Sequence, residues 1–219
     1  MIKGWGQLPL MNIVLTVTNY VGIVAFAVSG SMKAIRKGMD LLGIIVLGFT
    51  TALGGGIISD IMLGIYPPIN LTYLPYPLTA ISAGLATFIF YRVFSNASKP
   101  LMYADAVGLG AFSASGASLA YSVSHNPLLV VLVGSITAVG GGVVRDLLAN
   151  EVPVILTREF YASAAILGSL VYFLLRFIGI NDASSALASM TVTIILRFAA
   201  LRLKWELPRR IINEDAVKA

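Results

Sequence analysis

Seven apolar stretches of about 20 residues each follow one another along the chain, and only short polar gaps separate them. They cover approximately residues 12–34, 40–65, 74–95, 101–121, 127–149, 159–179 and 183–203. A helix of roughly 20 apolar residues crosses a bilayer core about 30 Å thick and satisfies its own backbone hydrogen bonds in lipid. Only 11% of the residues are charged, against about 25% in soluble domains. The sequence therefore predicts an all-α integral membrane protein with seven transmembrane helices over residues 1–205, followed by a charged cytoplasmic tail over residues 206–219.

A ten-residue phrase with three consecutive glycines occurs twice, as TALGGGIISD at 51–60 and as TAVGGGVVRD at 137–146. The similarity extends to the neighbouring spans on both sides of the phrase. At the same offset GIVAFAVSG at 22–30 aligns with GLGAFSASG at 108–116, and one residue away from that offset YPLTAISAGLATF at 76–88 aligns with YASAAILGSLVYF at 161–173. The first three spans therefore repeat as the next three.

The number of spans in each copy decides how the two copies are oriented. Three is odd, so the second copy must cross the membrane in the opposite sense. The chain is predicted to contain a 3+3 inverted-topology repeat, with repeat 1 at about 12–95, repeat 2 at about 101–179 and one additional helix at about 183–203. Folds of this kind commonly place their transport pathway where the two halves meet, near the midplane of the bilayer.

The glycine triplets fall inside the second and fifth spans, as Gly54, Gly55, Gly56 and Gly140, Gly141, Gly142. Each glycine weakens a helix by about 1 kcal/mol relative to alanine, and it also lets a neighbouring backbone approach closely. We expect hinges here, meaning kinked or partly unwound segments whose freed carbonyls face protein or water. The alternative is that the triplets serve only close helix packing.

A carboxylate follows each triplet by four residues, Asp60 in the first copy and Asp146 in the second. One helical turn separates it from the last glycine, so it projects near the glycine face. Ionisable residues inside membrane spans are costly and usually functional. The copies differ where Ser59 in the first is Arg145 in the second. Arg145 is predicted to pair with Asp146 or another carboxylate in the pathway, and the alternative is a cation that snorkels to the inner interface.

Polar side chains on the first and fourth spans could line an aqueous path beside these acids. They are Ser29 and Ser31 on the first span, and Ser113, Ser115 and Ser118 on the fourth. Helix packing is the alternative role for such residues. Lys33 closes the first span and is also a candidate, although its alternative is to anchor the span at the interface. Asp105 is placed at the cytoplasmic mouth of the fourth span.

The positions of lysine and arginine indicate the orientation in the membrane. Thirteen of the 15 basic residues fall on the side that receives the C-terminus. By the positive-inside rule the C-terminus is cytoplasmic and the N-terminus outside, as expected for a multi-pass protein of the plasma membrane. Asn70 then begins a glycosylation sequon on the outer side, and His125 lies in an interfacial loop.

Several function classes are excluded at this stage. The chain has no cysteine and one histidine, so thiolate or histidine metal sites are not expected, and no cofactor is predicted. The repeat places Asp60 and Asp146 toward opposite membrane faces, whereas an aspartyl dyad needs its carboxylates within a few ångströms. We therefore expect neither an enzyme nor a nucleic-acid partner.

The seven spans, the 3+3 inverted repeat and the motifs GGGIISD and GGGVVRD together resemble the trimeric intracellular cation (TRIC) channel family, in its prokaryotic branch. The resemblance covers about residues 12–205. It implies a homotrimer in membrane lipids with one pore in each protomer, lined by the first, second, fourth and fifth spans. The pore would pass monovalent cations, chiefly K⁺, with gating at the glycines. Arg145 matches a basic residue that is linked to gating in the family.

Two features of the sequence bear on this expectation. Animal members carry a Lys-Glu-Val motif where this chain reads VRD, so animal-type control is not implied. A carbonyl filter of the TVGYG type is absent from the sequence, so Na⁺ is expected to pass as well. The same prokaryotic group has been described as a possible glycine transporter. A secondary transporter of a small zwitterion such as glycine is therefore the alternative function.

Overall fold

The computed structural model describes residues 13–92, 100–157, 160–203 and 205, and every regular element in this part of the chain is a helix. The helices are α1 (Ile13–Arg36), α2 (Leu41–Met62), α3 (Ile69–Thr72), α4 (Pro75–Ile89), α6 (Pro100–Val123), α7 (Pro127–Leu148), α8 (Val154–Thr157), α9 (Tyr161–Phe177) and α10 (Asp182–Leu203). The predicted tail at 206–219 lies outside the described residues.

Each predicted span contains one long helix, although the helices differ in length. Among the described residues, five helices are long and apolar enough to cross a membrane: α1, α2, α6, α7 and α10. The other two are shorter, with 17 residues in α9 and 15 in α4. The seven-span count therefore stays a prediction, while the all-helical architecture is observed.

Side-chain caps begin the two glycine-containing helices at matching places. The Asp40 carboxylate accepts from the Gly43 amide at 2.7 Å at the start of α2. The Asn126 side chain accepts from Leu128 and Leu129 at the start of α7. Each cap satisfies amide groups that the first turn of a helix leaves without partners. The caps thus fix where α2 begins after the turn from α1, and where α7 begins after the turn from α6.

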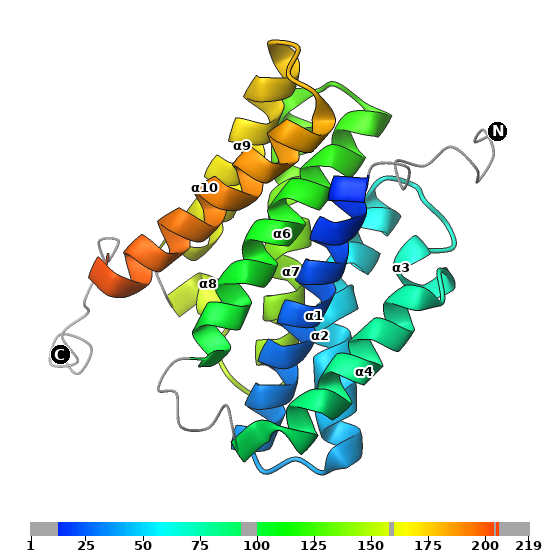
Figure 1. The fold of residues 1–219 in the computed structure, drawn as a ribbon, viewed down its shortest axis with the longest axis vertical. Helices are drawn as coiled ribbons and strands as arrows, with labels where there is room; N and C mark the ends of the chain where they lie inside the picture. Colours follow the sequence, from blue (N-terminus) through cyan, green and yellow to red (C-terminus); the bar gives the residue numbers. More distant parts are fainter. Residues whose placement is uncertain (1–12, 93–99, 158–159, 204, 206–219) are drawn as a thin grey trace, which may run out of the picture.

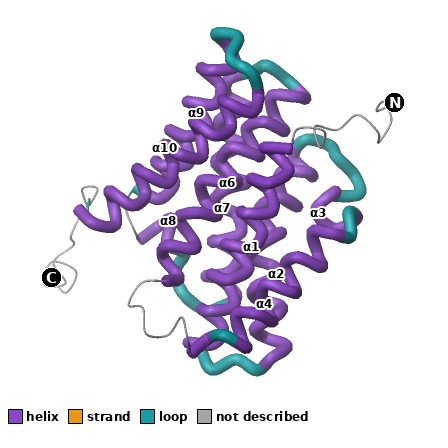
Figure 2. Tube along the Cα trace, in the orientation of Figure 1, coloured by secondary structure: helices purple, strands orange, loops and turns teal. Residues whose placement is uncertain are grey.

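Four helices form the centre of the molecule, and the others lie against them (Figure 1). α1 packs on α2 and α6, and α7 packs on the same two helices, so the four close a ring. α4 covers α1 and α2 on one side, while α9 and α10 cover α6 and α7 on the other. Figure 2 shows short loops between α1 and α2, between α6 and α7 and between α9 and α10. Any pathway through the ring is therefore bounded by both copies of the repeat.

The glycine triplets lie where α2 crosses α7, and both helices continue through them without interruption. A Cβ atom on Gly55 would collide with the carbonyl oxygen of Thr137, and one on Gly141 would collide with the carbonyl oxygen of Thr51. The prediction of partly unwound segments is therefore wrong. The facing backbone leaves no room for a side chain at these glycines, as the packing alternative expects, while the kinks stay a prediction.

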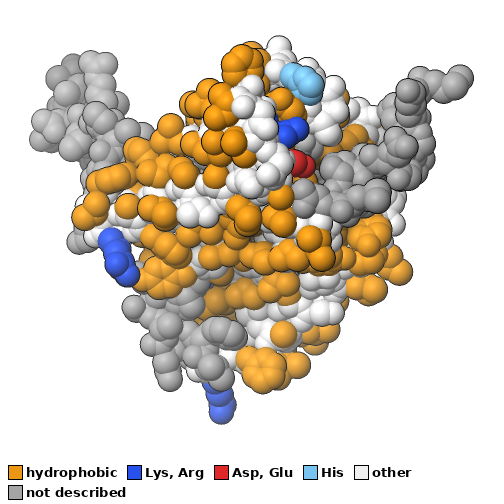
Figure 3. Space-filling view, turned by 45° about the horizontal axis from the view of Figure 1, so that its top comes forward, with side chains coloured by type: hydrophobic (Ala, Val, Ile, Leu, Met, Phe, Trp, Pro, Cys, Tyr) orange, Lys and Arg blue, Asp and Glu red, His pale blue; other side chains and the backbone are white. Residues whose placement is uncertain are grey.

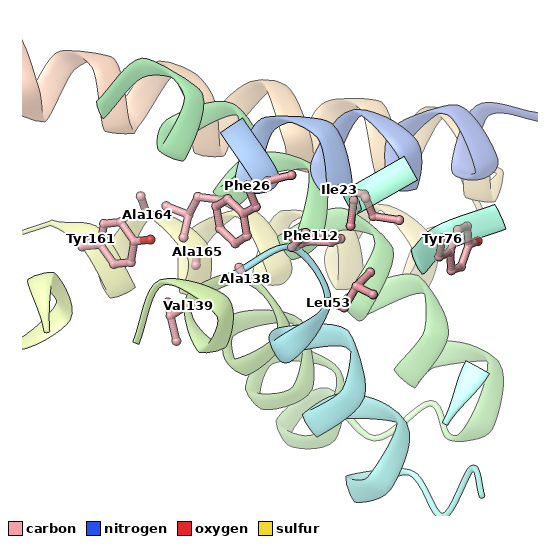
Figure 4. Packing of buried hydrophobic residues seen from close by; sticks show 14 residues of the cluster. Ile23, Phe26, Leu53, Tyr76, Phe112, Ala138, Val139, Tyr161, Ala164 and Ala165 are labelled. Carbon is pink, nitrogen blue, oxygen red and sulfur yellow. The ribbon is translucent and has the colours of Figure 1, made fainter. Parts of the chain in front are cut away.

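An aromatic pair fills the middle of the ring between α1 and α6 (Figure 4). The rings of Phe26 and Phe112 meet edge to face with their centroids 5.2 Å apart, and both side chains are buried. Gly22 lies against the Phe112 ring, and Gly108 lies against the Phe26 ring. Each copy thus supplies one ring and one glycine to the same contact. This reciprocity is what a twofold repeat predicts.

The outside of the bundle is largely apolar. Figure 3 shows hydrophobic side chains over most of the visible face, with few charged groups among them. Large exposed residues of this kind occur on several helices, for example Leu42, Phe88, Leu128 and Ile195. Soluble monomers rarely expose so much contiguous apolar surface. The surface therefore suits a lipid environment.

Candidate functional site

A buried arginine joins three of the four central helices. Arg145 on α7 is 1% exposed. Its Nε donates to Asp146 Oδ1 at 2.9 Å, and its Nη1 donates to Ser29 Oγ on α1 at 2.7 Å. The same Nη1 donates to Asp105 Oδ1 on α6. Arg145 therefore does not snorkel to the interface, and the predicted pairing with Asp146 is observed.

The ion pairs continue from Asp146 to the end of α1. Lys33 Nζ lies 2.9 Å from Asp146 Oδ1 and 2.6 Å from Glu151 Oε2. Lys37 Nζ lies 2.7 Å from Glu151 Oε1. We call the set of Lys33, Lys37, Asp105, Arg145, Asp146 and Glu151 the Arg145 network. Its three cations and three carboxylates balance at neutral pH, so the bundle holds these charges without a net excess.

Glu151 lies in the loop after α7, and the hydrogen bonds from Lys33 and Lys37 lower the pKa of its carboxyl group. A carboxyl with a lowered pKa stabilises the fold above its unfolded pKa, near 4.5, and this contribution is lost as the pH falls through the lowered value. We expect acidification below about pH 4.5 to lower the melting temperature of the wild type more than that of Glu151→Gln. Thermal unfolding over a pH series measures this, and parallel curves for the two proteins would contradict it.

A cavity of about 440 Å³ opens beside the network, and we call it the basic cavity. Its charged lining consists of Lys33, Arg36, Lys37, Arg145 and Arg197, together with Asp105 and Glu151. Basic groups outnumber acids along this wall. A cation that enters this cavity therefore meets a positive potential unless Arg145 and the lysines remain paired.

A second cavity, of about 90 Å³, lies at the other end of α1, and we call it the Asp60 cavity. The backbone amide and Nδ2 of Asn70 both donate to Asp60 Oδ2, at 3.1 and 2.9 Å. Asp60 Oδ1 is buried without a hydrogen-bond partner among the described residues. None of the described residues that line this cavity is basic. The two acids of the repeat therefore have opposite surroundings.

Both acids also hold the short helix that follows their own long helix. Asp60 accepts from Asn70 in α3, and Asp146 Oδ2 accepts from the backbone amide of Val154, the first residue of α8, at 2.9 Å. This shared contact explains why both copies carry a carboxylate here. Asn70 is only 8% exposed, and its side-chain nitrogen donates to Asp60, so the acceptor nitrogen of the sequon is buried and not available to a glycan.

The predicted polar residues divide into four groups. Asp60, Ser59, Ser115 and Ser118 line the Asp60 cavity, while Lys33 and Arg145 line the basic cavity. Ser29 and Asp146 belong to the buried contacts of Arg145. The other two hydroxyls join helices instead. Ser31 donates to the Ile44 carbonyl on α2, and Ser113 pairs with Thr193 on α10.

Sequence reasoning missed several partners of these residues. The sequence predicts Asp105 at the cytoplasmic mouth of the fourth span, but the residue is buried against Arg145. The sequence also gives no sign that Glu151 and Lys37 belong to the Arg145 network. Asn19, which lines the Asp60 cavity, occupies the repeat position of Asp105. Aligning the repeat beyond the glycine motifs would have found it. Of the 13 basic residues that oriented the chain, Lys99, Arg158, Lys204, Arg209, Arg210 and Lys218 lie outside the described residues, as does Lys3 on the other side.

Buried ion pairs and a cavity at each end of a helical ring are typical of membrane proteins that move ions or small solutes. The family model described as "Glycine transporter" matches residues 16–92 and 102–176, which correspond to the two copies of the predicted repeat. The chain belongs to this family, whose solved members include prokaryotic TRIC cation channels.

Relatives and solved structures extend over nearly the whole chain. The UPF0126 inner membrane protein YadS of Escherichia coli K12 is 36% identical over 198 residues, 89% of this chain and 95% of its own. A UPF0126 membrane protein of Deinococcus radiodurans is 41% identical over 157 residues, 71% of this chain and 73% of its own. A chain from a structural study of conductance through TRIC cation channels has a TM-score of 0.84 at 63% identity, covering 90% of this chain and 98% of its own.

A further crystal structure, of the TRIC trimeric intracellular cation channel orthologue from Rhodobacter sphaeroides, has a TM-score of 0.83 at 34% identity. It covers 88% of this chain and 99% of its own. These likenesses confirm the predicted family and the all-helical membrane fold. They also support a cation channel.

Proposed function

We propose that the protein is a monovalent cation channel with a pore inside each protomer. The observation that carries this proposal is the pair of cavities at opposite ends of α1: α1, α2, α6 and α7 all line the Asp60 cavity, and α1, α6 and α7 line the basic cavity together with α8 and α10. About 14 residues separate Asn19 in one cavity from Lys33 in the other, or roughly 21 Å along the helix. The pore would connect the two cavities past the buried Phe26–Phe112 pair.

In this proposal the structure corresponds to a closed pore. Phe26 and Phe112 fill the space between the cavities, and Arg145 stands at the edge of the basic cavity. A fixed positive charge about 4 Å from a passing cation repels it by about 4 kcal/mol at an effective dielectric constant of 20. Movement of Arg145 against its carboxylates would change that barrier and so gate the pore.

The assembly and orientation belong to the same proposal. We infer a homotrimer in the plasma membrane with the N-terminus outside and the C-terminus in the cytoplasm, built on an inverted repeat. The trimer is supported by the description of the R. sphaeroides orthologue as trimeric. The repeat is supported by the reciprocal contacts of Gly55 and Gly141 with the facing backbones. The basic cavity then faces the cytoplasm, and the Asp60 cavity faces outward.

Transport of a small zwitterion such as glycine is the second candidate, because the family model carries that description. A bound glycine needs a donor or a cation for its carboxylate. The Asp60 cavity offers a carboxylate and no basic residue among its described lining, which opposes that role. At the Asp60 cavity the missing cation favours the channel, whereas the basic cavity holds both cations and carboxylates.

Recordings from the purified protein in planar bilayers test the proposal. We expect discrete K⁺ currents, with Na⁺ passing at a permeability within about 100-fold of K⁺, because the sequence contains no TVGYG-type carbonyl filter. Liposomes loaded for radiolabelled glycine uptake provide the comparison. Saturable glycine accumulation without unitary currents would replace the channel by the transporter.

A further inference from the structure

The carboxylate of Asp60 is the one acid in either repeat motif whose charge has no described cation beside it. Both hydrogen bonds from Asn70 go to Oδ2, and Oδ1 is buried without a described partner. The whole residue is 1% exposed. A carboxylate in such surroundings is costly unless something neutralises it. The cavity beside it has room for such a group.

The repeat shows what that group could be. The guanidinium of Arg145 in the other half contacts three side chains: Ser29, Asp105 and Asp146. The residues at the matching positions of the repeat are Ser115, Asn19 and Asp60. All three line the Asp60 cavity. The cavity is thus the counterpart of the place that the Arg145 guanidinium occupies.

The cations that neutralise Asp146 have uncharged counterparts here. Arg145 corresponds to Ser59, and Lys33 corresponds to Leu119. Both of these smaller or apolar residues also line the Asp60 cavity. The Asp60 half therefore keeps the acid and polar side chains at the neighbouring positions, but it lacks both fixed positive charges. A space of about 90 Å³ remains in their place.

Three hydroxyl groups around this space are oriented to accept. They donate their protons elsewhere: Ser59 to the Gly56 carbonyl, Ser118 to Asp182, and Thr137 to the Val133 carbonyl. A hydroxyl that has donated its single proton presents only lone pairs to other neighbours. Oxygen lone pairs beside one carboxylate suit a hard ion with a single positive charge.

We propose that the Asp60 cavity binds one partly dehydrated monovalent cation, K⁺ or Na⁺, held by Asp60, Ser115 and Asn19. This inference deepens the proposed channel function, on which the choice of ion rests. In the other half of the repeat, the guanidinium of Arg145 takes the place of this cation. The cation enters from the side of α3 and binds between α3 and the Phe26–Phe112 pair.

Cation-dependent stability of the purified protein tests the site. Melting temperatures are compared in KCl and in N-methyl-D-glucamine chloride at equal ionic strength, because the large organic cation cannot enter the cavity. We expect K⁺ to raise the melting temperature saturably, by about 5 °C well above its dissociation constant. Asp60→Asn keeps an oxygen for the Asn70 donors but removes the charge, and it should abolish the shift.

Two further variants keep the test decisive if Asp60→Asn fails to fold. Ser59→Arg places a tethered guanidinium beside Asp60, so it should stabilise the protein in the organic salt and remove the response to K⁺. Ser59→Met has a similar length without charge, and it should give no such gain. Asp40→Asn, an exposed cap with an oxygen retained, is the matched control and should keep the K⁺ shift.

Several results would overturn the site. They are equal wild-type melting in the two salts, an undiminished K⁺ shift in Asp60→Asn, or a persistent K⁺ response in Ser59→Arg. Failure of the channel function is distinguished by the bilayer recordings. A wild type that conducts K⁺ without K⁺-dependent stabilisation refutes this site alone, and one that is stabilised without conducting refutes the channel alone.

Discussion

Gly55→Ala is expected to destabilise the protein by about 3 kcal/mol, whereas Gly54→Ala next to it should be tolerated. The added Cβ at Gly55 collides with the Thr137 carbonyl oxygen, and backbone at the α2–α7 crossing cannot move aside cheaply. At Gly54 the nearest atom is a methyl of Val144 at 3.6 Å, an ordinary contact. Alanine there should even favour the helix, by up to about 1 kcal/mol.

Thermal unfolding and size-exclusion chromatography in detergent measure this contrast. Gly141→Ala provides a repeat of the experiment in the other half, because its Cβ would meet the Thr51 carbonyl in the same way. We expect Gly141→Ala to behave like Gly55→Ala. If Gly54→Ala and Gly55→Ala melt together, the triplets act as flexible hinges and the packing account is wrong.

The glycine triplets also show where sequence reasoning reaches its limit. Low helix propensity is a local property that the sequence displays directly, and it predicted kinked or partly unwound segments. The contact that decides the outcome lies between Gly55 and Thr137, which come from different copies of the repeat. A single sequence carries no distance between these positions. Burial against the facing helix overrides the local preference.

The two acids illustrate the same division. Both motifs predicted a carboxylate near the glycine face, and the pairing of Arg145 with Asp146 followed from their adjacency. The sequence did not show that cations neutralise Asp146 but not Asp60, because Lys33 and Asp105 reach the Arg145 site from other helices. The apolar stretches are local signals, so the helices could be predicted from the sequence. The four central helices are the spans that the family resemblance placed around the pore. Partners that depend on tertiary approach could not be predicted.

Arg145→Ala is expected to raise K⁺ conductance several-fold and to weaken its dependence on voltage. The substitution removes a positive charge at the basic cavity and leaves Asp105 and Asp146 as local negative charge. Lowering an electrostatic barrier by only about 1.4 kcal/mol increases a rate tenfold. A charge that crosses the full membrane field contributes ~2.3 kcal/mol per 100 mV, and Arg145 would contribute part of this. Asp146→Asn removes an opposing charge and should lower conductance instead.

Arg145→Ala should lower the stability of the protein as well as raise its conductance. A substitution of a surface charge would not lower the stability in this way. Removing one member of a buried pair costs about 3–5 kcal/mol, because the remaining carboxylates stay desolvated. Asp105→Asn added to Arg145→Ala should recover part of that loss, since it neutralises one of them. Arg36→Ala is the matched control, because Arg36 lines the same cavity but is exposed. Paired bilayer recordings and thermal melts test this. The buried arginine does not gate the pore if Arg145→Ala and Asp146→Asn shift conductance in the same direction. The same conclusion holds if Arg36→Ala reproduces the effects of Arg145→Ala.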